Sequence, residues 1–123
     1  MSERRLYSIE EANALLPHLA PALVELREKY EQAQLARREI QIAAAGNGGS
    51  HERDDLNRLV ARVDELLDRL REWDVELRDV STGLIDFPSI VEGDDAYLCW
   101  RLGEPEVAWW HRPDDGFPGR RPL

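Results

Sequence analysis

Hydrophobic residues recur at intervals of three and four along two long stretches of the chain, separated by a glycine-rich segment at 46–49. Side chains with this spacing lie on one face of an α-helix. The first stripe runs from Leu16 to Ala44 and the second from Leu56 to Leu77. Glycine and asparagine tolerate positive φ and end helices. Two antiparallel helices joined by a hairpin turn at 46–49 are therefore predicted.

The first helix is predicted to begin at a capping box, the SIEE sequence at 8–11. In this motif the side chain of Ser8 accepts a hydrogen bond from the amide of Glu11, and the side chain of Glu11 accepts one from the amide of Ser8. Pro17 and Pro21 fall inside the hydrophobic stripe. Each lacks an amide and crowds the carbonyl four residues before it. A break or kink is expected near Leu16, which would leave 9–16 as a separate short helix.

The pattern changes close to Asp74. Residues 75–78 alternate between apolar and polar side chains, which suits a half-buried strand as well as a last helical turn. We favour an end of the second helix near Trp73.

Three segments after this point have the composition of strands. A short strand is predicted over 84–87, ending at Pro88, because proline removes a donor from the ladder. Residues 96–102 and 107–111 are rich in aromatic and branched side chains, and 103–106 between them is typical of a hairpin loop. Three or four antiparallel strands are expected.

A sheet of this size is not stable alone in water, so one of its faces must pack on the helices. The predicted fold class is α+β, with a long antiparallel helical hairpin packed against a small C-terminal antiparallel β-sheet. The length of 123 residues suits a single domain, 1–123. The hairpin is expected at about 9–74, the β segment at about 75–111 and an irregular tail at 112–123.

Strand alternation divides the β segment into two faces. The apolar face, with Leu98, Trp100 and Trp110, is expected to anchor the sheet on the helices. The opposite face is polar enough to form a site. Together with a loop carboxylate and a tail arginine, it supplies the candidate ligand-binding residues Cys99, Arg101, Glu104, Trp109 and Arg120.

A divalent metal ion is the cofactor that these residue types would suit. Imidazole and carboxylate groups together bind zinc, iron or manganese. The chain has no close-spaced signature such as HExxH, and buried His and Glu side chains are more often structural. The candidate metal ligands are His111, Glu104, Glu106, Asp86, His18 and Glu11.

A Cys99–His111 pair would be the corresponding nucleophile, since a neighbouring imidazole can lower the pKa of a thiol. A lone strand cysteine is more often a small core residue. We therefore assign no catalytic residue, and the sequence leaves open whether the protein is an enzyme.

Charge narrows the choice of partners and location. Sixteen basic and twenty-five acidic residues give a net charge of −9, which repels phosphate backbones and anionic membranes. No stretch approaches the roughly 20 apolar residues of a spanning helix. The single cysteine forms no internal disulfide, and the N-terminus lacks a signal-peptide pattern. We expect neither nucleic acid nor a membrane as a partner. We expect a cytoplasmic location.

Five motifs are spread over nearly the whole chain: SIEEANALLP at 8–17, GLIDFP at 83–88, YLCWRLGEPE at 97–106, WH at 110–111 and GFPGR at 116–120. Together they resemble the prokaryotic family known as domain of unknown function 2203. The resemblance implies no activity, substrate or site residue. The resemblance implies a glycine at the end of the second helix, and this chain has Asp74 near that point.

The leading functional hypothesis is a non-enzymatic interaction or scaffold domain that homodimerises through its helices. A two-helix hairpin leaves part of each stripe uncovered, and two such hairpins pair into a four-helix bundle. The alternative is a metal-binding protein or metal-dependent enzyme whose site lies on the β segment around His111 and Glu104.

Overall fold

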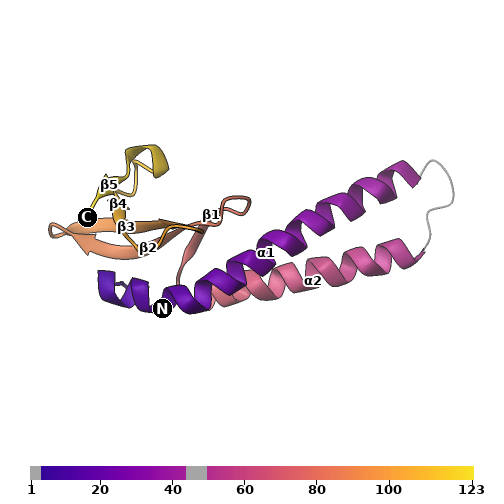
Figure 1. The fold of residues 1–123 in the computed structure, drawn as a ribbon, viewed down its shortest axis with the longest axis horizontal. Helices are drawn as coiled ribbons and strands as arrows, with labels where there is room; N and C mark the ends of the chain where they lie inside the picture. Colours follow the sequence, from indigo (N-terminus) through magenta and orange to yellow (C-terminus); the bar gives the residue numbers. More distant parts are fainter. Residues whose placement is uncertain (1–3, 44–49) are drawn as a thin grey trace.

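The computed structural model describes residues 4–43 and 50–123. Two helices, α1 (Ile9–Ala43) and α2 (Ser50–Glu72), run alongside each other and extend well beyond one end of a five-stranded sheet (Figure 1). The predicted α+β class is confirmed. The hairpin turn predicted at 46–49 lies outside the described residues.

The predicted capping box opens α1. The amide of Ser8 donates to Glu11 Oε1 (3.0 Å), and the amide of Glu11 donates to Ser8 Oγ (3.1 Å). The helix then continues through both prolines, so the predicted break and the separate helix at 9–16 are wrong. Leu19 and Leu23 are fully buried nearby. Burying each of them contributes about 1.5–3 kcal/mol to the stability of the fold. This contribution offsets the loss of the backbone hydrogen bonds that the prolines, without an N–H group, cannot donate.

The second helix ends where the sequence predicted, through a left-handed residue. Asp74 has φ 56°, and its amide donates to the carbonyl of Arg71 (3.0 Å). The next amide, of Val75, donates to the carbonyl of Leu70 (3.1 Å). These two bonds form a Schellman motif, in which the left-handed position usually belongs to glycine. Asp74 thus occupies the position at which the family resemblance places a glycine.

All five strands are antiparallel and follow one another across the sheet in chain order. The sequence predicted only three or four strands and an irregular tail. The tail instead contains a short 3₁₀ helix, Phe117–Gly119, and a last strand that pairs with the one before it. The strands are β1 (Glu76–Asp79), β2 (Leu84–Val91), β3 (Asp94–Arg101), β4 (Trp109–His111) and β5 (Arg121–Pro122).

Strand β2 runs through Pro88, so the prediction that a strand ends there is wrong. The N–H and C=O of one strand residue point to the same side. The carbonyl of Pro88 accepts the amide of Tyr7 (2.7 Å), and β1 reaches along β2 only as far as Asp86. The nitrogen of Pro88 therefore faces the outer edge of β2, where a proline costs no bond between strands.

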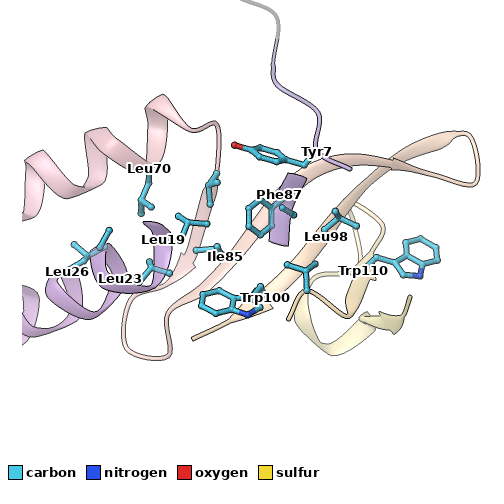
Figure 2. Packing of buried hydrophobic residues seen from close by; sticks show 14 of the residues in the cluster. Tyr7, Leu19, Leu23, Leu26, Leu70, Ile85, Phe87, Leu98, Trp100 and Trp110 are labelled. Carbon is cyan, nitrogen blue, oxygen red and sulfur yellow. The ribbon is translucent and has the colours of Figure 1, made fainter. Parts of the chain in front are cut away.

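One face of the sheet packs on the start of α1 and the end of α2. Figure 2 shows leucines from both helices gathered in the space between them, with Leu19 and Leu23 next to Ile85 of β2. The predicted apolar face is confirmed, because Leu98, Trp100 and Trp110 are all buried in this core. The helix and strand side chains labelled there are Leu19, Leu23, Leu26, Leu70, Ile85, Phe87, Leu98, Trp100 and Trp110.

Within residues 4–43 and 50–123, neither helix combines the length and the apolar character that crossing a membrane would require.

Candidate metal centre

Three side chains capable of binding a metal meet on the polar face of the sheet. Asp86 of β2 is the register partner of Cys99 in β3, and His111 lies in β4 opposite Tyr97. Alternate residues of a strand share a face, so all three project away from the helical core. At most 2% of each residue is exposed. One ligand atom from each lies within 4.8 Å of the other two.

The tail encloses this cluster. A cavity of about 360 Å³ adjoins the three side chains, and the tail segment 113–117 lines it as well. Figure 1 shows the tail on the side of the sheet opposite the start of α1. Arg78 and Leu84 complete the lining. A polar cluster on an open sheet face is thereby buried.

The ring of His111 is held in one orientation by its own backbone neighbour. Nδ1 lies 2.7 Å from the carbonyl oxygen of Arg112, which can only accept, so Nδ1 donates and carries a proton. Nε2 lies 2.9 Å from Asp86 Oδ2. In the neutral ring this nitrogen presents a lone pair to a carboxylate oxygen. A proton or a cation between the two atoms is needed to satisfy both.

The carboxylate of Asp86 is only partly satisfied. Its Oδ2 atom also accepts from Arg78 Nε (2.8 Å). Its Oδ1 atom is buried and has no hydrogen-bond partner among the residues that the structure describes. Buried polar atoms nearly always have a partner, and leaving one without costs about 1–3 kcal/mol. A cation bound by Oδ1 would remove this cost.

Cys99 is not arranged as a nucleophile. Burial, and next the nearby carboxylate of Asp86, raise the pKa of the Cys99 thiol to about 12. Without a metal the thiol is protonated at neutral pH and is a poor nucleophile. The Nε2 atom of His111 is directed at Asp86 and so does not serve as a base for this thiol. A coordinated metal ion would displace the thiol proton.

Arg120 fastens the tail beside Cys99. Its guanidinium lies 4.6 Å from the ring centre of Trp109 and 4.8 Å from that of Phe117. Nη1 is 4.0 Å from Cys99 Sγ, and Nη2 donates to Glu104 Oε2 (2.5 Å). Stacking and ion pairing together explain why only 10% of this side chain is exposed.

The residues predicted as a ligand site therefore divide into two groups. Glu104, Trp109 and Arg120 form the tail anchor, and Glu104 also accepts the amide of Arg101 (2.7 Å). The side chain of Arg101 is exposed and lies over the Phe117 ring at 5.7 Å. Cys99 alone of the predicted set belongs to the buried cluster.

The six predicted metal ligands are also divided. Among the described residues, the His, Cys, Asp and Glu side chains close enough to share one ion are His111, Asp86 and Cys99. Glu11 is occupied by the helix cap, Glu104 pairs with Arg120, and Glu106 and His18 are exposed. The alternation of side chains along each strand could predict that Cys99 and His111 share one face of the sheet. Nothing in the sequence indicated the register that brings Asp86 opposite Cys99.

Fold and site together define a class of protein, an α+β chain with a buried Asp-Cys-His cluster beneath its C-terminal tail. Residues 5–123 match the family model described as an uncharacterized conserved protein (DUF2203), and the chain belongs to this family. The resemblance drawn from the motifs is thereby confirmed. No curated protein and no solved structure matched the chain.

Proposed function

We propose that this protein binds one divalent transition metal ion, zinc in the first instance, through Asp86, Cys99 and His111. The observation that carries the proposal is the pairing of two acceptors, His111 Nε2 and Asp86 Oδ2. Beside them lies Oδ1 of the same carboxylate, which has no hydrogen-bond partner in the described part of the chain. A cation satisfies all three atoms at once.

The donor set and its spacing support this proposal. Zinc binds Cys sulfur, His nitrogen and carboxylate oxygen at about 2.0–2.3 Å, which places tetrahedral donors about 3.3–3.8 Å apart. The three side chains meet within 4.8 Å, so only small shifts would close the site on an ion. The thiolate favours zinc or iron over manganese and magnesium.

Each of the three ligands also has an outer partner that orients it, as metal ligands commonly do. Asp86 accepts from Arg78, His111 donates to the carbonyl of Arg112, and Cys99 contacts Arg120. An imidazolium–carboxylate ion pair would explain the His111–Asp86 contact without a metal. Among the described residues it would leave Asp86 Oδ1 with no donor other than the weakly donating thiol of Cys99, and for this reason we prefer the metal.

Elemental analysis tests the proposal. Protein purified without chelator, or incubated with zinc and gel-filtered, is expected to carry about one ion per chain. His111→Ala and Cys99→Ala should each lose it, because two ligands hold an ion far less well than three. His18→Ala is the matched control, since this exposed histidine lies on α1 away from the cluster. Wild-type protein that binds neither zinc, cobalt, iron nor manganese would falsify the proposal.

We further propose, as a second and separate function, that the helices mediate homodimerisation. The outer half of α1 exposes Tyr30, Leu35 and Ile42, which are 40%, 59% and 71% accessible. Leu35 and Ile42 are seven residues apart and so share one face of the helix. Apolar side chains that protrude together from a helix favour burial against a partner.

Charge on the same helix supports a second copy of this chain as that partner. Glu31 and Arg38 lie on either side of Leu35. Two α1 helices packed antiparallel about Leu35 would place Glu31 of each copy near Arg38 of the other, which is the self-complementarity that a twofold interface needs. Light scattering at micromolar concentration should give about twice the chain mass of 14.2 kDa. A particle that stays at the chain mass on concentration contradicts the dimer.

A further inference from the structure

We propose that the metal ion keeps one exchangeable coordination position facing the cavity, and that this position takes a small ligand with an anionic oxygen, nitrogen or sulfur donor. This inference rests on the metal site proposed above. It goes beyond that site because it distinguishes a structural ion, closed by protein ligands, from one that binds or transforms a small molecule.

The direction of the ligands is the first reason. Asp86, Cys99 and His111 come from three adjacent strands and project from one face of the sheet. An ion held by them is approached by protein ligands from the sheet side only. Its remaining side is directed toward the tail, and between sheet and tail lies the cavity.

The size of the cavity is the second reason. Its volume of about 360 Å³ far exceeds the roughly 30 Å³ that one water molecule occupies in the liquid. A small organic anion would fit beside the ion. Leu84 and Phe117 supply apolar surface in the lining, and such surface is typical of sites that hold small molecules.

Arg78 supplies the third reason, because it lines the same cavity. Its Nε donates to Asp86 and its Nη2 to Glu76. A guanidinium has five N–H donors, so others are left for an acceptor in the cavity. A ligand bound through one atom to the ion could therefore accept a charge-assisted hydrogen bond from Arg78 through another.

A carboxylate of the tail is the competing occupant of the fourth coordination position. Asp114 and Asp115 line the cavity, but both are exposed, and Asp115 lies 3.9 Å from Arg121. Neither belongs to the group of side chains whose ligand atoms meet. A tail carboxylate would have to move inward to reach the ion, whereas a free anion needs no such movement.

Cobalt-substituted protein titrated with azide provides the test. Cobalt reports its coordination through visible d–d bands, and a thiolate–cobalt band in the near ultraviolet shows that Cys99 is bound. We expect a saturable change in the d–d bands with one azide per cobalt, and no loss of the thiolate band.

The outcomes separate this inference from the metal proposal. Failure to bind cobalt or zinc overturns the metal site itself. Protein that binds cobalt but whose spectrum azide does not change overturns the exchangeable position alone. A response to azide that appears only in the Asp114→Asn, Asp115→Asn double variant also overturns it, because a tail carboxylate would then be the fourth ligand.

The role of Arg78 is tested at saturating cobalt, since loss of an outer partner also weakens metal binding. Arg78→Gln is expected to bind azide about tenfold more weakly, as befits the loss of one hydrogen bond to a charged group. Arg71→Gln, at an exposed arginine of α2 that pairs with Asp68, is the control and should leave azide affinity unchanged. Equal azide affinity in wild type and Arg78→Gln would contradict the contact with Arg78.

Discussion

At the scale of single residues, the ring of His111 is oriented by one contact with a neighbour in the sequence and one with a distant residue. The carbonyl of Arg112, one residue away, fixes which ring nitrogen carries the proton. The carboxylate of Asp86, twenty-five residues earlier, lies 2.9 Å from the other ring nitrogen. The first contact follows from the chain itself, and the second exists only when β2, β3 and β4 are assembled in register.

Asp74 is a second residue whose backbone decides its role. Its φ of 56° is a conformation that costs most L residues about 1–2 kcal/mol, and aspartate somewhat less. Its carboxylate accepts the amide of Arg5 (3.2 Å). This contact with the N-terminal segment is one benefit that a glycine at the position would lack.

Substituting Asp74 should separate these two effects. Asp74→Ala and Asp74→Gly both lose the contact with Arg5, and they differ only in the Cβ atom. We expect the glycine variant to have a free energy of unfolding about 1 kcal/mol higher than the alanine variant, because glycine adopts positive φ without strain. Urea denaturation measures the difference. Two variants of equal stability would show that this helix end relaxes out of the left-handed conformation.

At the scale of elements, α1 and α2 are linked by a bidentate ion pair. Arg62 donates through Nε to Glu25 Oε2 (2.6 Å) and through Nη2 to Glu25 Oε1 (2.7 Å). The same guanidinium reaches Glu65 (2.8 Å) on its own helix. Paired, parallel hydrogen bonds of this kind fix orientation as well as proximity. This ion pair therefore helps to set how the two helices lie against each other.

The ion pair predicts a dependence of stability on pH. The hydrogen bonds from Arg62 hold the pKa of Glu25 below its usual value of 4.5. A carboxyl whose pKa is lowered by folding contributes stability above its unfolded pKa and loses this contribution as the pH falls through the folded pKa. Glu25→Gln should therefore be less stable than wild type at pH 7, and the gap should narrow below about pH 4.5.

Thermal unfolding followed by circular dichroism between pH 3 and 7 would measure that gap. Glu28→Gln, at an exposed glutamate one turn further along α1, serves as the control and should track the wild type more closely. A gap between wild type and Glu25→Gln that stays constant down to pH 3 would rule out a stabilising role for the Glu25 carboxylate.

At the scale of the whole molecule, the two proposed functions lie in different parts. The proposed metal ligands belong to the sheet and are enclosed with the tail. The proposed dimer contact lies on the second half of α1, where Leu35 borders a surface hollow shared with Val80 and Ser81 of the β1–β2 turn. The core that joins these parts is built from the first half of α1, the end of α2 and one sheet face. Each function should therefore be removable without loss of the other.

Leu35→Glu tests this separation directly. A charge in the middle of the proposed twofold contact would meet its own copy, so the particle mass should fall to that of one chain. Zinc stoichiometry should stay at about one, and His111→Ala should show the reverse pattern. Ile90→Glu makes the same apolar-to-acidic change at an exposed position of β2 and serves as the control for light scattering. A Leu35→Glu variant that keeps the wild-type mass places any interface elsewhere.

The sequence by itself determined the elements that have a strong local signal. Three-four spacing predicted both long helices, the SIEE motif predicted the cap of the first, and period-two alternation separated the two faces of the sheet. The motifs also identified the family. These features depend on residues within a few positions of one another, and propensity and periodicity report such relations well.

Tertiary structure decided what depends on contacts between distant segments. Packing around the prolines kept α1 whole, the absence of β1 beside Pro88 let β2 continue through it, and β4 gave the tail a partner for β5. The candidate site belongs to the same category. Strand register, which no local pattern encodes, placed Asp86 opposite Cys99, and the tail buried both with His111. A candidate metal site assembled from three strands becomes recognisable only when the strands are paired.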